Sequence, residues 1–289
     1  MSQQTMPALA FIGAGNMASS LIGGWCAHCQ RQNITPDVTV ADTSESQLQK
    51  VAERFEVSTT VSNTEAVKQA DIAIIAVKPN LVETVCRDIG AALNDSTTVL
   101  SVAAGVRLQD MQRWLSAEPE PNDPDNARAL IRSMPNTPAL FGAGITGMFA
   151  NSACTATVKA QAEQVMQAAG KVVQVDEEAL LDAVTAVSGS GPAYFFYLIE
   201  CMAANGEQLG LSKEAARELA IETAYGAAVM AKESEIDAAT LRANVTSKGG
   251  TTAAALESFQ ADDFAATIER GMIAARDRAI GLGEEFGSS

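Results

Sequence analysis

The residues best suited to chemistry lie in one short segment of the C-terminal third, Val245-Thr246-Ser247-Lys248-Gly249-Gly250-Thr251-Thr252. This segment places hydroxyls and adjacent glycines within a stretch whose pattern is otherwise helical. At the start of a helix, the backbone N–H groups of Gly250, Thr251 and Thr252 would form a nest for a carboxylate. Because the formal net charge of the chain is −15, an anion must be held by local donors of this kind. A glycine-rich loop followed by an N-cap is the alternative.

A second chemical signature is the turn Gly13-x-Gly15-x-x-Ala18, which joins an apolar run to a helical pattern. The glycines permit a tight turn and let the backbone approach a pyrophosphate, and the helix N-terminus offers free N–H groups to that anion. The turn lies in a strand-turn-helix unit near the N-terminus, which favours a dinucleotide site over an ordinary turn.

Asp42 ends the second predicted strand, where an acid can accept hydrogen bonds from an adenosine ribose. A carboxylate at this place disfavours the 2′-phosphate of NADP. Thr43 and Ser44 follow, and their hydroxyls can still donate to a phosphate. The pattern weakly favours NADH being used at least as well as NADPH, and it leaves the choice open.

Two further segments are predicted to be rigid or kinked. In Met134-Pro135-Asn136-Thr137-Pro138, two prolines fix the backbone around Asn136, whose amide could present a donor and an acceptor to a carboxamide such as that of nicotinamide. Ser188-Gly189-Ser190-Gly191-Pro192 breaks one helical pattern and starts the next. This second segment is either a simple turn between helices or the lining of a small pocket.

The thiols and the single histidine are not expected to carry chemistry. Cys26 and Cys29 flank His28 within a predicted helix, and the other cysteines are remote from this pair. A zinc or redox site needs further ligands or a tight turn, so we expect buried structural thiols, a surface histidine and no metal site. The proline-rich and acidic segment 117–127 is expected to be a surface loop.

The elements that must position these residues change in type along the chain. Strands are predicted at 8–12, 38–41, 72–77, 99–102, 128–133, 144–149 and 172–175, with helical patterns between most of them. This alternation is typical of a doubly wound, Rossmann-like α/β sheet. Only helices are predicted afterwards, at 179–187, 192–209, 213–231, 238–245 and 262–282. We therefore predict a dinucleotide-binding domain over 1–175 and an all-helical dimerisation and substrate-binding domain over 176–289.

Composition limits the classes of partner. The net charge of −15 argues against nucleic acid, because phosphate binding needs clustered Lys and Arg. No apolar run approaches the roughly 20 residues of a membrane span, and the first residues are polar, so a cytoplasmic protein without a membrane partner is expected. The alanine-rich helices after residue 160 are of a kind that often packs against a second subunit.

Taken together, the motifs resemble one enzyme family along nearly the whole chain. The Gly13 turn, Ala76-Val77-Lys78-Pro79, the Asn136 segment, Ser188 to Tyr194 and the loop from Val245 to Thr252 follow the order and spacing of the pyrroline-5-carboxylate reductases. The resemblance implies NADPH or NADH as cofactor, and hydride transfer to the cyclic imine of 1-pyrroline-5-carboxylate to give L-proline. It also implies a homodimer with interleaved helical domains, commonly assembled into a larger ring.

The resemblance assigns roles to individual residues. For the cofactor these are Ile12, Gly13, Ala14, Gly15, Asn16, Met17, Thr43, Asn63, Ala76, Val77, Lys78, Pro79, Ala103, Ala104 and Asn136, to which Asp42 is added from its place after a strand. For the substrate they are Glu235, Asn244, Val245, Ser247, Gly250, Thr251 and Thr252. We choose Thr252 as the catalytic residue, with its hydroxyl on the ring nitrogen. Lys248 is a departure, since the family usually has proline there.

Two other functions remain open from the sequence. One is a hydroxyacid- or prephenate-type dehydrogenase on the same sheet, although such enzymes usually place a catalytic Lys or His in the helical domain, and His28 lies in the other domain. The other is a non-catalytic nucleotide sensor or scaffold, which would keep the glycine turn without needing an intact loop from Val245 to Thr252.

Overall fold

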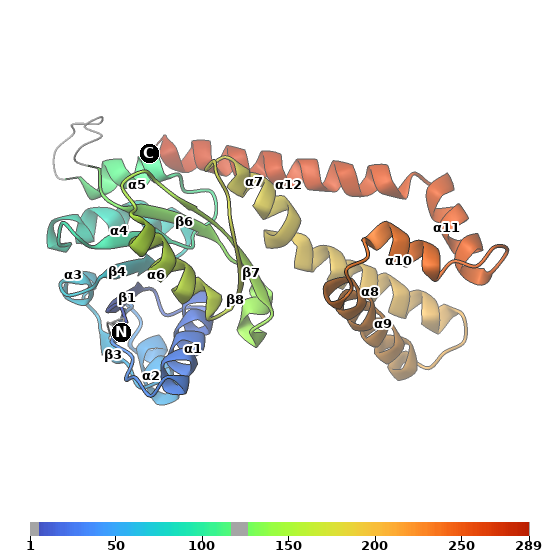
Figure 1. Ribbon diagram of the computed structural model, residues 1–289, viewed down its shortest axis with the longest axis horizontal. Helices are drawn as coiled ribbons and strands as arrows, with labels where there is room; N and C mark the ends of the chain where they lie inside the picture. Colours follow the sequence, from blue (N-terminus) through green and yellow to red (C-terminus); the bar gives the residue numbers. More distant parts are fainter. Residues whose placement is uncertain (1–5, 117–126, 289) are drawn as a thin grey trace. The chain divides into compact units, whose positions relative to one another are not determined.

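The computed structural model describes residues 6–116 and 127–288. The predicted surface loop at 117–127 lies, except for its last residue, outside this described part. One eight-stranded sheet is formed by the described residues, and only helices follow it along the chain (Figure 1). The strands are β1 (Leu9–Ile12), β2 (Val38–Ala41), β3 (Ser58–Thr60), β4 (Ile72–Ile75), β5 (Thr98–Ser101), β6 (Leu130–Met134), β7 (Gly144–Ala150) and β8 (Gly170–Gln174).

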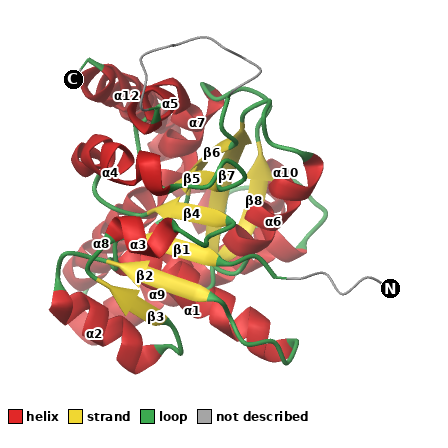
Figure 2. Cartoon of the chain, turned by 90° about the vertical axis from the view of Figure 1, so that its left-hand side faces the viewer, coloured by secondary structure: helices red, strands yellow, loops and turns green. Residues whose placement is uncertain are grey.

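The strand order is β3-β2-β1-β4-β5-β6-β7-β8 (Figure 2). Neighbouring strands pair in parallel except for β6 and β7, which pair antiparallel. The order turns back at β1 and β4, and in doubly wound sheets ligands bind outside the carboxyl ends of the strands at such a point. The predicted fold class is confirmed, and the point where the strand order turns back lies beside the turn that follows β1.

Helices cover both faces of the sheet and connect its strands. They are α1 (Asn16–Arg31), α2 (Glu45–Arg54), α3 (Asn63–Val67), α4 (Val82–Ile89), α5 (Leu108–Leu115), α6 (Ala156–Gln167) and α7 (Leu180–Val184). Strand residues alternate between the faces, as a period of two requires. Leu9 and Phe11 pack with α1 and α6, whereas Ala10 and Ile12 pack with α3, α4 and α5.

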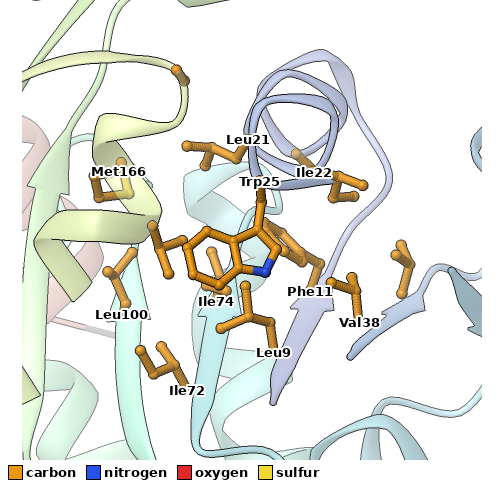
Figure 3. Close-up of a cluster of buried hydrophobic side chains, with 14 of the residues drawn as sticks. Leu9, Phe11, Leu21, Ile22, Trp25, Val38, Ile72, Ile74, Leu100 and Met166 are labelled. Atoms are coloured by element: carbon orange, nitrogen blue, oxygen red, sulfur yellow. The ribbon is translucent and has the colours of Figure 1, made fainter. Parts of the chain in front are cut away.

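The core under α1 is built around Trp25. Its indole is fully buried among side chains from β1, β4, β5 and α6, of which Phe11, Ile74 and Met166 are examples (Figure 3). Apolar burial of this kind is worth about 25 cal/mol per Å² of surface removed from water, so large side chains such as Trp25 dominate it. This core fixes α1, and with it the turn from which α1 starts.

The remaining helices are α8 (Gly191–Gln208), α9 (Lys213–Glu233), α10 (Ala238–Asn244), α11 (Thr251–Ala261) and α12 (Phe264–Gly287). Pro192 lies in the first turn of α8, where its missing N–H costs nothing, as predicted. Helices α8 and α9 pack against each other, and Ala216 and Ala220 are buried between them. Ser212 caps α9 and Asp237 caps α10 with side-chain oxygens, which explains where these two helices begin.

Packing divides the chain into two compact units. The first contains 1–189 and 275–289, and the second contains 190–274. Helix α7 packs on β6 and β7, so it belongs with the sheet although it follows the last strand. Our boundary at 175/176 marks the change from strands to helices, and the functional division that we attach to it stays a prediction.

Some elements differ from the sequence prediction. The edge strand β3 and the short helix α3 are additional, because a three-residue strand and a five-residue helix leave almost no periodic pattern. The helix predicted at 179–187 is α7 followed by a π-helical turn, Thr185–Gly189. Helix α11 was expected only as a helix start, and α12 extends to Gly287 instead of ending near 282.

Candidate active site

The carboxyl ends of the central strands meet directly through backbone hydrogen bonds. Gly13 N–H donates to Ala41 O at 2.7 Å, Ala76 N–H to Ile12 O at 2.8 Å, and Val102 N–H to Ile75 O at 3.1 Å. These bonds continue the sheet by one residue beyond β1, β4 and β5. They bring the predicted cofactor segments after β1, β2, β4 and β5 together at one edge.

The glycine turn fits a dinucleotide. A Cβ on Gly13, which has φ +104°, would lie 2.7 Å from Ala76 O, so only glycine lets the turn pass this close to β4. A Cβ on Gly15 would meet nothing within 4 Å, so space is open above the turn. Gly15 is also the N-cap of α1 and provides no side chain to cap it. The start of α1 therefore faces this space with free backbone donors, which suits a pyrophosphate.

The residues of the glycine turn after β1 are held in place by burial and by hydrogen bonds. Ile12 and Ala14 are buried, and Asn16 and Met17 open α1. Ser20 Oγ donates to Asn16 O at 2.9 Å, which stiffens the first turn of that helix. Asp42 comes directly after β2, and its carboxylate accepts the N–H of Ala14 at 2.8 Å. The turn after β1 is thus tied to the turn after β2.

The proposed adenosine side contains residues from three further connections. Thr43 and Lys78 are exposed, while Ala76, Val77 and Pro79 are half-buried. Asn63 opens α3, and its Nδ2 donates to Asp88 Oδ2 at 2.9 Å. Ser44 occupies the N-cap position of α2, but its hydroxyl bonds Ser46 Oγ at 3.0 Å and does not cap the helix. The first turn of α2 therefore has no side-chain cap.

The loop after β5 has a second support that the sequence did not predict. Ala103 N–H donates to Ser101 Oγ at 3.1 Å, and Gly105 has φ +77°. A Cβ on Gly105 would lie 3.0 Å from Leu282 Cβ, so the C-terminal end of α12 rests on this loop. Arg113 Nη2 adds a hydrogen bond of 2.8 Å to Gly287 O. Ala103 and Ala104 are therefore positioned by α12 as well as by β5.

Asn136 is bonded within the protein, which differs from its predicted role. Its Oδ1 accepts Ile145 N–H at 2.9 Å, and its Nδ2 donates to Ser188 O at 3.1 Å. Only 8% of the residue is exposed. The amide thus ties the start of β7 to the π-helical turn, with one of its two N–H groups and one of its two oxygen lone pairs engaged. The backbone around Asn136 still lies at the carboxyl end of β6, beside β5.

The π-helical turn Thr185–Gly189 is anchored by a buried ion network that sequence reasoning missed. Arg132 on β6 contacts Glu178 at 3.2 Å and Asp182 at 3.1 Å, and Leu108 N–H donates to Glu178 at 2.9 Å. A buried Arg with both partners present fixes α7 on the sheet. The signal in the sequence was an Arg inside an apolar strand and acids four residues apart, Glu178 and Asp182. Turns of this kind are often found at functional sites.

The predicted substrate loop connects α10 to α11 in the second unit. Gly250 N–H donates to Ser247 O at 3.0 Å, so the expectation that this N–H is free for an anion is wrong. Gly249 has φ +72°, and this left-handed residue turns the chain back so that the bond closes. The N–H groups of Thr251 and Thr252 have no partner among the described residues, and no side chain caps α11. Of the three N–H groups expected to bind an anion here, those of Thr251 and Thr252 remain available.

The other proposed substrate residues surround this loop. Asn244 ends α10, and Val245, Ser247 and Thr252 are exposed in the single chain. Thr246 Oγ1 donates to Arg242 O at 2.6 Å, which fixes the loop to α10. Glu235 is exposed between α9 and α10. Lys248 is exposed as well and forms no ion pair within the described residues.

The thiols of α1 are structural, as expected. Cys26 and Cys29 are buried in the core, and burial raises the pKa of the Cys26 thiol to about 11. His28 is half-buried instead of lying free on the surface, because it stacks on Trp25 and bonds Gln164 Nε2 at 3.1 Å. No cluster of potential metal ligands occurs among residues 6–116 and 127–288. None of the helices in these ranges is long and apolar enough to cross a membrane.

Comparison with known proteins agrees with this arrangement. A family model described as pyrroline-5-carboxylate reductase dimerisation matches residues 178–282, and one described as NADP oxidoreductase coenzyme F420-dependent matches residues 8–105. A pyrroline-5-carboxylate reductase from Pseudomonas aeruginosa is 44% identical over 282 residues, which are 97% of this chain and 98% of that relative. The chain belongs to the pyrroline-5-carboxylate reductase family. The relative from Vibrio alginolyticus is 38% identical over 94% of this chain and 96% of its own length.

Solved structures of the family have the same fold. The pyrroline-5-carboxylate reductase from Coxiella burnetii is 35% identical, covers 96% of this chain and 99% of its own, and gives a TM-score of 0.87. The Plasmodium falciparum pyrroline carboxylate reductase, solved with NADP bound, is 27% identical over 96% of this chain and 100% of its own, with a TM-score of 0.80. The A. aeolicus prephenate dehydrogenase is only 12% identical at a TM-score of 0.51, which shows a shared fold alone. The rival dehydrogenase function therefore gains no support beyond the sheet.

Proposed function

We propose that the chain catalyses the NAD(P)H-dependent reduction of the cyclic imine of 1-pyrroline-5-carboxylate to L-proline. The observation that carries this proposal is the loop from Val245 to Thr252, whose hydroxyls and free helix-start donors suit a small carboxylate. Family membership over nearly the whole chain supports the same substrate. A scaffold protein would not need this loop to be intact.

The loop residues would act by binding and orientation. The N–H groups of Thr251 and Thr252, at the positive end of α11, would hold the substrate carboxylate. The hydroxyl of Thr252 would bond the ring nitrogen, and since a threonine hydroxyl is a poor acid we assign it orientation instead of proton donation. Gly250 would serve by its bond to Ser247, which sets the direction of the helix start. Asn244, Val245, Ser247 and Glu235 would shape the same site.

The first unit would bind the cofactor at the edge described above. Bound NAD(P)H would supply the hydride for the imine carbon, and the ring nitrogen would take its proton from solvent, so that one NAD(P)H and one proton are consumed for each proline formed. The turn from Ile12 to Met17 would hold the pyrophosphate with backbone donors, and the connections after β2 and β4 would line the adenosine. Ala103 and Ala104 would approach the nicotinamide end, and Asn136 would act there through the segments that it ties together. Catalysis would then rest mainly on orientation and on stabilisation of charge.

The proposal includes assembly and location. Homodimers with interleaved helical domains, grouped into a larger ring, would follow the pattern that the family resemblance implies. Large apolar side chains exposed on α8 and α9 of the single chain, among them Phe196, Tyr197 and Tyr225, support burial of this surface between subunits. A cytoplasmic location belongs to the same proposal.

The primary experiment measures oxidation of NADH and of NADPH by the purified protein. The substrates are 1-pyrroline-5-carboxylate and its six-membered homologue, each tested with each cofactor. We expect oxidation with the five-membered ring and formation of proline in equal amount. Absence of oxidation in all four combinations contradicts the proposal.

Variants of Thr252 test the role of its hydroxyl. Thr252→Val keeps the shape of the side chain but removes the hydroxyl, so we expect turnover to fall by roughly 10²-fold, the usual size for a lost polar contact to the reacting group. Thr252→Ser is the matched control and should keep most of the activity. Cofactor affinity, measured by fluorescence titration, should be the same in all three proteins. Unchanged turnover in Thr252→Val would remove this residue from the mechanism.

A further inference from the structure

Glu178 links three elements of the first unit through one carboxylate oxygen. Its Oε1 accepts the N–H of Leu108, the first residue of α5, at 2.9 Å. The same oxygen accepts Nη1 of Arg132, on β6, at 3.2 Å. Glu178 itself lies just before α7. Because the bond to Leu108 joins residues 70 apart, no local pattern in the sequence predicts it.

The bond to Leu108 fixes the point where the loop after β5 enters α5. Arg107 is the N-cap of α5 and provides no side-chain cap for it. Leu108 is buried, and the described residues offer its N–H no acceptor besides Glu178. A carboxylate at this place satisfies a helix-start N–H and is favoured by the positive end of the helix dipole. Loss of Glu178 would therefore leave a buried donor unpaired and release this end of the loop.

The other end of the same loop is held independently. Ala103 N–H donates to Ser101 Oγ at 3.1 Å, and Ser133 Oγ donates to Ser101 O at 2.9 Å. The turn between the two supports is also contacted by α12. Only three residues separate Ala104 from Leu108, so a shift of Leu108 reaches Ala104 over a short stretch of chain.

Arg132 holds the Glu178 carboxylate in place. Its side chain is almost fully buried, and its Nη2 also contacts Asp182 Oδ1 at 3.1 Å. One buried cation therefore faces two acids, and removal of either acid still leaves Arg132 with a partner. The acids differ in one respect: among the described residues, only Glu178 also accepts an N–H from the loop after β5. The two roles of the network can thus be separated by substitution.

We propose that Glu178 is a positioning residue for hydride transfer, because its bond to Leu108 sets the place of Ala103 and Ala104 against the nicotinamide ring. It acts through the loop and does not touch the reacting atoms. This inference rests on the proposed function, which places the nicotinamide end beside Ala103 and Ala104. A misplacement of about 1 Å can cost on the order of 10²-fold in rate, so a loosened loop should reduce turnover.

The test compares the binding of NADH with that of ADP-ribose, which lacks only the nicotinamide ring. Both are measured by calorimetry on the full chain without substrate. In Glu178→Ala we expect NADH to bind about tenfold more weakly and ADP-ribose to stay within about twofold of the wild type. Turnover at saturating cofactor should fall by about 10- to 100-fold. Equal weakening of both ligands, or of neither, overturns the inference.

The ligand pair follows the cofactor that the chain prefers. If the wild type binds NADPH more tightly than NADH, NADPH and 2′-phospho-ADP-ribose replace the pair above, and the same ratio of dissociation constants is compared. If the wild type binds neither cofactor, the proposed function fails and this inference fails with it.

Two variants of the same network distinguish positioning from general stability. Asp182→Ala removes the other acid from Arg132 but keeps the bond to Leu108. It should lower the midpoint of thermal unfolding and leave the ratio of the two dissociation constants unchanged. Glu178→Gln keeps an oxygen that can accept the Leu108 N–H, so it should restore the ratio and most of the turnover. An equal shift of the ratio in Asp182→Ala, or no recovery in Glu178→Gln, would contradict positioning by Glu178.

Leu108→Pro tests the same bond from the donor side and decides the matter even if Glu178→Ala does not fold. Proline at the first position of a helix removes the N–H and is tolerated there. Arg107 already has the extended backbone that a following proline requires, with φ −85° and ψ 150°. Leu108→Ala loses the side chain but keeps the N–H, and is the matched control. We expect the ratio to shift in Leu108→Pro alone, and the same ratio in both variants would overturn the inference.

Discussion

Lys248 lies in the substrate loop where the family usually has proline. It therefore differs from the usual residue in two ways, in its charge and in the freedom of its backbone. Its ammonium is exposed and forms no ion pair among the described residues, in a chain of net charge −15. Its backbone is also less restrained than that of proline. The next residue, Gly249, already has the left-handed conformation that closes the loop. The charge and the backbone can therefore be tested separately.

Lys248→Met removes the charge and leaves the backbone free. We expect the KM for 1-pyrroline-5-carboxylate to rise about two- to fivefold, as is usual for an exposed charge pair, and the effect to shrink in high salt. The KM for NADH should not change. Lys232→Met, on the last turn of α9, is the control for loss of one positive charge elsewhere. If Lys248→Met behaves like Lys232→Met, the ammonium has no part in substrate binding.

The buried thiols give a prediction about pH. Burial raises the pKa of Cys26 to about 11 and that of Cys86 to about 12, so both are protonated in the folded protein at neutral pH. At pH 8 a thiol of pKa 11 is about 0.1% ionised, against roughly a quarter for an ordinary cysteine, and only the thiolate is alkylated. Labelling with iodoacetamide should modify at most Cys201 before unfolding and all five cysteines in urea. The rate at which Cys26 is labelled in the folded protein should rise with pH, because the fraction of thiolate rises. Rapid labelling of Cys26 at pH 8 would contradict its burial.

For single residues, the sequence predicted the place in the fold better than the hydrogen-bond partners of the side chain. Asp42 was placed correctly after β2, but its bond to Ala14 joins residues 28 apart and leaves no local pattern. Asn136 was expected to face a ligand, whereas its amide bonds Ser188, 52 residues away. A side chain that can donate and accept will bond the nearest backbone groups in the folded chain, and those are set by the tertiary structure.

Among the elements, α12 shows how strongly small residues control packing. A Cβ on Gly283 would lie 2.9 Å from Arg107 Nε and 3.0 Å from Gly105 O, so the helix contacts the loop after β5 through bare backbone. Gly281, two residues earlier on the same helix, would have its nearest neighbour at 3.8 Å. The two glycines thus differ in surroundings while sharing one helix.

Gly283→Ala and Gly281→Ala should therefore change stability in opposite directions. The first forces the helix off the loop, and we expect a loss of about 1–3 kcal/mol, as for other overpacked sites. The second gains helix propensity of up to about 1 kcal/mol with no clash. Urea unfolding measured by circular dichroism gives both values. Equal effects of the two substitutions would show that α12 does not rest on the loop after β5.

Regular elements were predictable where periodicity was long. The apolar runs of β1 and β4 and the helical pattern of α1 reflect burial on a known side. The π-helical turn at Thr185–Gly189 was not predicted, because it results from the anchoring of α7 by Arg132 and from the contact of Gly189 with Met134. Such a turn is decided by packing and not by the propensity of its residues.

For the whole molecule, the second unit is the part least able to bury its own apolar surface. Phe196 and Tyr197 on α8 are 64% and 68% exposed in the single chain, and Tyr225 on α9 is 66% exposed. Large apolar patches of this kind mark interfaces between proteins. The sequence indicated helices that pack against a partner, but it did not identify which faces remain uncovered.

Phe196→Glu should weaken assembly, because it places a charge on this apolar surface. We expect a shift to smaller species in size-exclusion chromatography with light scattering, and a loss of activity that parallels it. Phe141→Glu is the control, since Phe141 is 88% exposed but lies in the first unit. An unchanged oligomer in Phe196→Glu would exclude this face of α8 from the interface.

The C-terminal end of α12 also affects the order in which the protein forms during translation. The first unit combines residues 1–189 with residues 275–289, so the ribosome makes all of the second unit before the first can be closed. At about 5–20 residues per second the delay is on the order of ten seconds. Throughout it the loop after β5 lacks Gly283, and the core beside α5 lacks Phe286. The first unit therefore stays incomplete during translation until residues 275–288 have been made.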